Sequence, residues 1–153
     1  IKVSVAEAKE YMERYLATFS GVAAYQSNVV AEAKEKGYVS TLMGRRRWLP
    51  ELKSANHNLR SFGERVALNM PIQGTAADVI KLAMIRVRDA IRAEGLKAQL
   101  ILQVHDELIV ECPEEEAERV KALLTREMVG VVDYTVPMKA DSAAGKSWGE
   151  AKG

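Results

Sequence analysis

Hydrophobic residues recur at helical spacing in the first third of the chain. Ser4 and Glu7 form the sequence pattern of a capping box, and the apolar positions that follow predict a helix over 5–19. Gly21 is expected to break this helix, and a second helix is predicted to end at Gly37, which suits a left-handed C-terminal cap. The apolar positions that recur at helical spacing in the first helix are Val5, Ala8, Met12, Tyr15, Leu16 and Phe19.

The longest helical pattern begins near Asn56 and reaches Gly95, a plausible residue to follow its C-terminus. Pro71 lies inside this pattern, where proline removes a hydrogen bond, so it is expected to interrupt and kink the helix. The predicted buried positions are Leu59, Phe62, Val66 and Met70 before the proline, and Ala76, Ile80, Ala83, Met84, Val87 and Ile91 after it.

Two segments alternate in the manner of strands and predict hairpins. Residues 38–43 are rich in strand formers, and Gly44 then turns the chain into three arginines, which predicts a small hairpin with a basic tip. Residues 100–104 and 108–111 flank His105, Asp106 and Glu107, which predicts a tight antiparallel hairpin with these three side chains at its tip.

The last part of the chain is expected to add a helix and a third strand. Pro113 should open a helix that Gly130 ends, and acidic residues in its first turn favour the positive end of the helix dipole. Residues 134–140 predict the strand. The predicted fold class is α+β, with several amphipathic helices packed on a small antiparallel sheet that contains the second hairpin.

Composition narrows the class of protein. The 153 residues are 48% hydrophobic and 28% charged, which predicts one domain with its own core. No apolar run approaches the ~20 residues of a membrane span and no signal peptide is evident, so we expect no membrane partner and a cytoplasmic location. The chain begins at Ile1 rather than Met, which suggests a piece of a longer protein. The one cysteine, Cys112, is expected to be a buried inert thiol.

The net charge of +1 conceals a basic stretch. Arginine and lysine outnumber acids between Gly44 and Arg65, and a local basic patch predicts an anionic partner. The stretch begins with Arg45, Arg46 and Arg47, whose guanidinium groups could fork onto phosphate oxygens. A solvated charged face is the alternative, and composition leaves both open.

Two interpretations fit the tip of the second hairpin. A solvated turn is one, because aspartate is a good turn former. The other is a site for a hard divalent ion such as Mg²⁺, which prefers one or two carboxylates together with substrate phosphate oxygens. Asp106 beside Glu107 would offer those carboxylates on two rigid strands.

A polar stripe on the long helix also has two interpretations. Arg65, Asn69 and Gln73 are spaced by four residues and should share one face. Their side chains suit the minor-groove edge of DNA, where every base pair offers similar acceptors, so such a face would check pair geometry while ignoring sequence. A merely solvated helix face is the alternative.

Three strings in this chain resemble the family-A DNA polymerases. Gln103-Val104-His105-Asp106-Glu107 before an apolar strand looks like motif C of that family, and Gly44-Arg45-Arg46-Arg47 before an aromatic residue is similar to a segment that runs beside bound duplex. The most specific string is Arg65-Val66-Ala67-Leu68-Asn69-Met70-Pro71-Ile72-Gln73-Gly74-Thr75-Ala76-Ala77-Asp78. The resemblance covers nearly the whole chain in the family's order.

The resemblance implies template-directed DNA synthesis with two Mg²⁺ ions, and primer-template DNA and dNTP as partners. It makes Asp106 the motif C aspartate and metal ligand, with Glu107 as a secondary catalytic carboxylate and His105 as a contact to the primer terminus. It implies that Arg65, Asn69 and Gln73 bind the minor groove. It also implies that Arg45, Arg46 and Arg47 bind phosphates.

The chain departs from the family in lacking motif A, which supplies the second aspartate, and motif B, which binds the incoming nucleotide. We therefore expect a C-terminal fragment, with fingers helices over 1–43 and part of the palm over 44–153, whose metal site is incomplete and which is inactive alone. Exposed apolar surfaces would favour self-association. The alternatives are a non-catalytic nucleic-acid-binding module and an interaction module.

Overall fold

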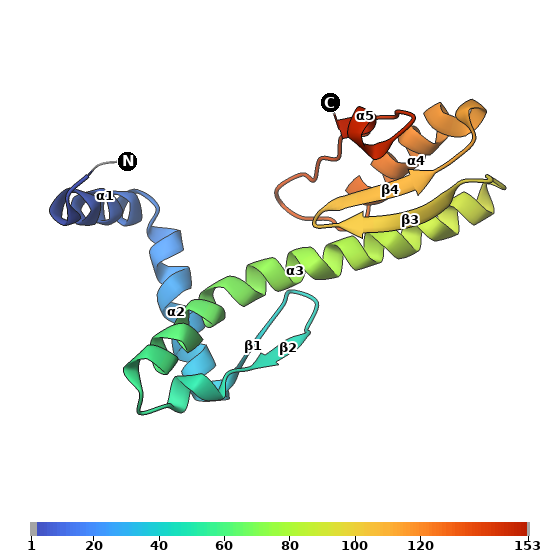
Figure 1. The fold of residues 1–153 in the computed structure, drawn as a ribbon. Helices are drawn as coiled ribbons and strands as arrows, with labels where there is room; N and C mark the ends of the chain where they lie inside the picture. The colour runs from blue at the N-terminus through green and yellow to red at the C-terminus, as the bar shows by residue number, and fades with distance from the viewer. Residues whose placement is uncertain (1–2, 153) are drawn as a thin grey trace. The chain divides into compact units, whose positions relative to one another are not determined.

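The computed structural model describes residues 3–152. The chain divides into two compact units, Ile1–Thr75 and Ala76–Gly153. Helix α3 (His57–Ala93) is continuous and contributes its first part to one unit and its last part to the other (Figure 1). This boundary differs in position from the predicted division at residues 43 and 44, and the assignment of fingers and palm parts stays a prediction.

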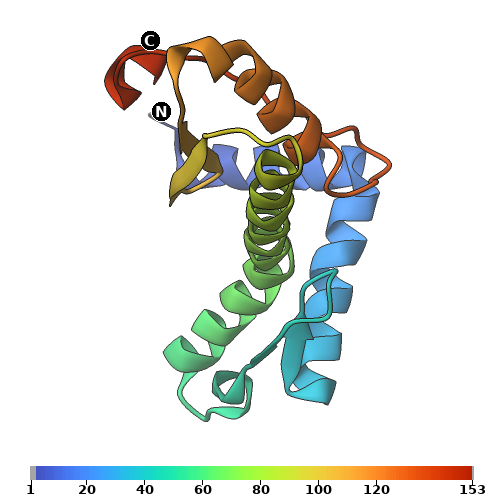
Figure 2. The same cartoon turned by 90° about the vertical axis from the view of Figure 1, so that its right-hand side faces the viewer.

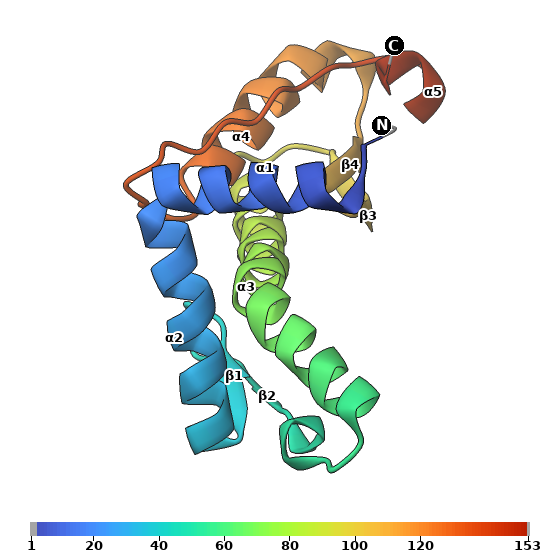
Figure 3. The ribbon, with the colours of Figure 1, turned by 90° about the vertical axis from the view of Figure 1, so that its left-hand side faces the viewer.

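The first unit begins with two helices, α1 (Val5–Thr18) and α2 (Ser20–Lys36). The predicted capping box is confirmed: the Ser4 hydroxyl accepts from the Glu7 amide, and the Glu7 carboxylate accepts from the Ser4 amide at 2.8 Å. The helices meet at Phe19 (Figure 3). The predicted break between two helices is confirmed, but it lies at Phe19 and not at Gly21. Gly21 lies in the first turn of α2, where the backbone N–H groups have no intrahelical partner to lose.

The apolar stripe of α1 exists but is not buried. None of the described residues of α1 is buried, and Val5 and Met12 are 88% and 65% exposed. The helical spacing of the apolar residues is therefore confirmed, but helical periodicity marks only which face is apolar and does not specify what covers it.

The predicted basic hairpin is confirmed with shorter strands. Gly37 caps α2 at φ +77°, and β1 (Tyr38–Ser40) then pairs antiparallel with β2 (Arg46–Trp48) (Figure 2). The turn occupies 41–45, so Arg46 and Arg47 lie in β2 rather than at the tip. A short 3₁₀ helix, Pro50–Lys53, leads to α3. The core of this unit consists of Ala33, Val39, Leu49, Leu52 and Ala67.

Helix α3 passes through Pro71 without ending, so the predicted interruption is wrong. A proline removes one backbone donor, while the helical hydrogen bonds before and after it continue. Leu59 and Phe62 are 49% and 44% exposed, which corrects their assignment to the buried face. The predicted C-terminus is confirmed: Gly95 is left-handed at φ +65°, and its amide donates to the Arg92 carbonyl at 3.2 Å.

The second unit contains the other hairpin, β3 (Gln99–Val104) and β4 (Glu107–Glu111), which are antiparallel with a bulge at Ile101. A 3₁₀ turn (Glu114–Glu116) leads to α4 (Ala117–Val129), which ends at Gly130 as predicted, and α5 is Trp148–Lys152. The core residues are Val87, Ile91, Ala98, Val120 and Leu123. The α+β class is confirmed.

The predicted third strand over 134–140 is wrong, because these residues form no strand. A strand requires hydrogen bonds to a neighbouring strand, and each described sheet has only two strands that pair with each other. The strand-forming composition of this segment is therefore not sufficient to make it a strand. None of the described helices combines the length and the apolar content that crossing a membrane requires.

Ion pairs link α3 and α4 in the second unit. Arg126 Nε lies 2.8 Å from Glu127 Oε1, Arg86 Nε lies 3.2 Å from Glu127 Oε2, and Arg126 Nη2 lies 2.8 Å from Glu94 Oε1. The hydrogen bond from Arg126, and then that from Arg86, lowers the pKa of Glu127, whose side chain is only 14% exposed. The carboxylate is therefore stabilised in the folded state.

This pair of hydrogen bonds predicts an acid-sensitive contribution to stability. The pKa of Glu127 is lower in the folded state than in the unfolded state, where it is about 4.3. The ionised carboxylate therefore stabilises the folded protein at pH values above about 4.3, and this stabilisation is lost as the pH falls through the folded-state pKa. We expect Glu127→Gln to lower the unfolding free energy at pH 7 by about 1 kcal/mol and to have little effect near pH 2. Urea titrations at both pH values measure this, and equal effects at both would contradict it.

Candidate functional site

The tip of the second hairpin consists of His105 and Asp106. Glu107 was predicted to lie at the tip as well. It lies instead at the start of β4, where it pairs with Val104 of β3. His105 has a left-handed backbone at φ +53°, and its carbonyl accepts a 2.6 Å hydrogen bond from Gln103 Nε2. The turn holds Asp106 exposed to solvent.

The two adjacent carboxylates have different surroundings. Glu107 Oε1 lies 3.1 Å from Lys152 Nζ on α5. Within residues 3–152, the Asp106 carboxylate has neither a hydrogen bond nor an ion pair. The Glu107 pair is well exposed and adds little to stability. Of these two adjacent carboxylates, Asp106 is therefore the one that is available to an added cation.

The described residues could supply part of a metal site. No group of three histidine, cysteine, aspartate or glutamate side chains among them is arranged to hold an ion. An exposed carboxylate at a rigid turn nevertheless fits Mg²⁺, which commonly takes one or two protein carboxylates and completes its shell with water and phosphate oxygens. Asp106 fits that role, and Glu107 would have to leave Lys152 to join it.

The arginines of the first hairpin are held in different ways. Arg46 lies over the Tyr38 ring, 4.6 Å from its centroid, and the Tyr38 and Trp48 rings are 5.1 Å apart in an edge contact. Arg45 Nη2 donates to the Gly74 carbonyl on α3 at 2.9 Å. Arg47 is exposed, and its side chain has no hydrogen bond or ion pair within the described part of the chain.

The polar stripe of α3 is exposed at all three positions, Arg65, Asn69 and Gln73. Arg65 Nη1 donates to the Ser61 hydroxyl at 3.0 Å. The arginine hairpin and this stripe belong to the same compact unit. His105, Asp106 and Glu107 belong to the other.

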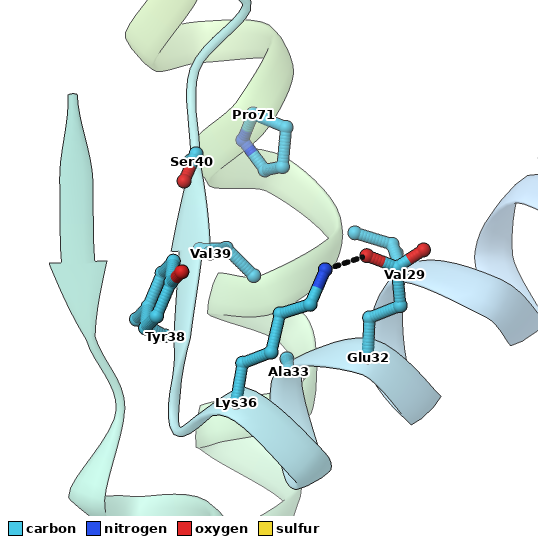
Figure 4. A pocket seen from close by; sticks show the side chains of 8 residues that line it. All are labelled: Val29, Glu32, Ala33, Lys36, Tyr38, Val39, Ser40 and Pro71. Atoms are coloured by element: carbon cyan, nitrogen blue, oxygen red, sulfur yellow. Dashed lines mark hydrogen bonds and ion pairs between the residues drawn. The ribbon is translucent and has the colours of Figure 1, made fainter. Parts of the chain in front are cut away.

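The structure also contains a hollow of about 220 Å³ between α2, β1 and α3 (Figure 4). It is lined by Val29, Glu32, Ala33, Lys36, Tyr38, Val39, Ser40 and Pro71. Lys36 Nζ is paired with Glu32 at 2.8 Å, so the charges in it already neutralise each other (Figure 4). None of the predicted site residues lines this hollow.

Cys112 does not have the surroundings of a nucleophile. Burial, and then the nearby charges of Glu116 and Glu115, raise the pKa of its thiol. The unreactive thiol form is therefore favoured at neutral pH.

Four residues that contribute to these arrangements were given no role by the sequence. Thr41, Gly74 and Thr75 join the arginine hairpin to α3, and Lys152 pairs with Glu107. For Gly74 and Thr75 the available signal was a glycine followed by threonine inside a helical pattern, because both residues are poor helix formers. Lys152 is separated from Glu107 by too many residues for any local pattern to connect them.

Comparison with known proteins identifies the family. The model of DNA polymerase family A matches residues 1–150. The chain belongs to DNA polymerase family A. It is 52% identical to DNA polymerase I of Geobacillus stearothermophilus over 99% of this chain, and 53% identical to that of Bacillus subtilis over 95%. It spans 17% of the length of each of these relatives.

The fold of this family A chain also resembles a solved structure. That structure is the POL domain of Pol1 from M. smegmatis in complex with DNA primer-template and dNTP. It superposes with a TM-score of 0.94 at 46% identity, over 99% of this chain and 27% of the other. The resemblance seen in the three sequence strings is therefore confirmed at the level of the family.

Proposed function

We propose that this family A chain is the duplex-binding and motif C part of a template-directed DNA polymerase. The observation that carries the proposal is Asp106, an exposed carboxylate without a protein partner among the described residues, on a hairpin whose sequence resembles motif C. Membership of DNA polymerase family A supports the reaction class. Primer-template DNA and dNTP are the proposed substrates, and the M. smegmatis structure contains both. The cytoplasm is the proposed location.

Each site residue has a physical role in this proposal. Asp106 would hold Mg²⁺, with Glu107 as a secondary carboxylate nearby, and His105 would contact the primer terminus from the same turn. When bound, a pair of such ions lowers the pKa of the attacking hydroxyl and neutralises the leaving phosphate. Of the two adjacent carboxylates at this turn, only Asp106 is free of a protein partner among the described residues, so the second metal-binding aspartate would come from a motif A outside the chain.

The two other groups would hold the duplex. Arg45, Arg46 and Arg47 would bind phosphates, which fixes position without selecting sequence. Arg65, Asn69 and Gln73 would contact the minor groove, where acceptors are shared by all base pairs. The exposure of the stripe and of Arg47 supports this assignment.

The 153-residue chain by itself is expected to be inactive in synthesis, because one aspartate cannot position two ions. Primer extension with Mg²⁺ and all four nucleotides tests this, using the complete encoded polypeptide as the positive control. Product formed by the 153 residues alone would contradict the expectation.

The isolated chain is also expected to self-associate. Val5, Met12, Leu42 and Ile72 are among the large apolar side chains that are more than half exposed, and exposed apolar surface favours association. Light scattering across a wide concentration range should show a mass that rises with concentration. A constant monomer mass would contradict the prediction.

A non-catalytic nucleic-acid-binding module is the second candidate. It is favoured by one observation: the arginine hairpin and the polar stripe lie in one compact unit, while Asp106 lies in the other. The two candidates differ in what precedes the chain. An Asp-Tyr-Ser-X-X-Glu type string upstream in the same reading frame would favour the polymerase.

A further inference from the structure

The turn between β1 and β2 is fastened to α3 by two hydrogen bonds. The Leu42 amide donates to the Thr75 hydroxyl at 2.9 Å, and Arg45 Nη2 donates to the Gly74 carbonyl at 2.9 Å. Thr41 completes the arrangement from the turn side. We call these five residues, Thr41, Leu42, Arg45, Gly74 and Thr75, the hairpin clasp.

The two threonines of the hairpin clasp are buried, and the hydroxyl of each is hydrogen-bonded. Thr41 and Thr75 are 5% and 7% exposed, and they are the only buried polar side chains among the described residues. The Thr75 hydroxyl donates to the Pro71 carbonyl while it accepts from Leu42, and Thr41 Oγ1 accepts from the Arg45 amide at 3.1 Å. Removing either hydroxyl would leave the N–H of Leu42 or Arg45 without its partner at a part-buried position, which costs stability.

Gly74 allows the turn to lie against the helix. A Cβ atom at this position would be 2.7 Å from Thr41 Cγ2, which is closer than carbon atoms can approach. An alanine would favour the helix by itself, because glycine is a poor helix former. The glycine therefore serves the contact with Thr41 rather than the helix.

The hairpin clasp adjoins both groups of predicted DNA contacts. Arg46 and Arg47 follow Arg45 directly, and Gln73 precedes Gly74 directly. Since the clasp fixes the turn on the helix, it also fixes the start of β2 relative to Gln73. Two contacts held in one arrangement bind the same ligand far more tightly than two that move independently, because the second contact forms at high effective concentration.

We propose that the hairpin clasp is a positioning device that makes the arginine strand and the helix stripe bind one DNA duplex as a unit. Thr75 and Gly74 are its positioning residues and do not themselves contact DNA. The proposal rests on the proposed function, since it requires that Arg47 and Gln73 bind duplex. Loosening the clasp should weaken the combined binding of duplex by Arg47 and Gln73, although both side chains remain.

The clasp itself can be tested without DNA. Thr75→Val keeps the side-chain shape and loses the hydroxyl, whereas Thr75→Ser keeps the hydroxyl. In the complete encoded polypeptide, hydrogen exchange followed on a peptide containing Leu42 should be at least about tenfold faster with valine and close to the parent with serine. Equal exchange in the valine variant and the parent would overturn the proposal.

Gly74 offers a test by suppression. Gly74→Ala should weaken primer-template binding about tenfold, because it forces the turn away from the helix. Adding Thr41→Ser removes the colliding methyl group and keeps the hydroxyl that accepts from the Arg45 amide, so this double variant should recover most of the affinity. A double variant no better than Gly74→Ala would overturn the proposal.

The coupling to DNA is measured with Arg47→Ala in two backgrounds. In the parent protein, Arg47→Ala should weaken primer-template binding about tenfold. In the Thr75→Val background it should weaken binding by less than about threefold, because Arg47 and Gln73 are no longer held in one arrangement there. Arg14→Ala, a change of the same charge on α1, should cost nothing in either background. Equal losses from Arg47→Ala in both backgrounds would overturn the clasp alone. A parent protein that binds no duplex would refute the proposed function, and the exchange result would still show whether the clasp exists.

Discussion

Replacing Asp106 with asparagine in the complete encoded polypeptide is expected to lower the rate of primer extension on the order of 10³-fold, or about 4 kcal/mol in activation free energy. The side chain is exposed and has no partner among the described residues, so the change should not affect folding. An amide is a much weaker ligand for Mg²⁺ than a carboxylate, and the loss should fall on the chemical step. Single-turnover extension with saturating nucleotide measures it.

The matched control for this experiment is Asp133→Asn, which removes a second exposed aspartate from the same unit. It should leave extension unchanged. The affinity of Asp106→Asn for primer-template should also stay close to that of the parent. An Asp106→Asn protein that keeps the parental rate would contradict the assignment of this carboxylate to the metal site.

The combined variant Arg47→Ala, Arg65→Ala and Gln73→Ala is expected to weaken duplex binding by about 100-fold at low salt. The three exposed side chains together would lose contacts worth about 2.7 kcal/mol, of which Arg47 alone would account for about 1.4 kcal/mol, or tenfold. Arg47 is the residue of this set assigned to phosphate, so its loss alone should reduce the slope of log affinity against log salt by about 0.9. Fluorescence anisotropy of labelled duplex over a range of salt concentrations measures both quantities.

The controls for the second experiment separate charge from position. Gln73→Ala alone should weaken binding with no change of salt slope, because a neutral amide displaces no counterion. Arg14→Ala removes a positive charge from a helix without predicted DNA contacts and should change neither quantity. A triple variant that binds duplex as the parent does would instead favour an interaction module without a nucleic-acid role.

The hairpins were predictable because both carry strong local signals. Strand alternation ends at a turn-forming residue in each, Gly44 in one and Asp106 in the other, and the pairing then follows from proximity along the chain. The helix ends at Gly37 and Gly95 were predictable for the same reason, since glycine adopts the left-handed backbone without strain. The resemblance to motif C depended only on adjacent residues.

Features that depend on distant parts of the chain were not predictable from local patterns. The segment over 134–140 has strand preference but no strand beside it among the described residues. The stripe of α1 is apolar but uncovered. In both cases the local pattern describes what a segment could do, and a partner that no local pattern specifies decides whether it does.

The sequence by itself determined the family, the positions of the helix caps and hairpins, and the residues to suspect, because each of these is encoded within a few neighbouring positions. Only the tertiary structure showed that Glu107 is paired with the distant Lys152 while Asp106 is not. Only the tertiary structure showed that the arginine turn is hydrogen-bonded to Thr75 and Gly74 of α3. These contacts link residues far apart in the chain, and their formation depends on how the elements pack.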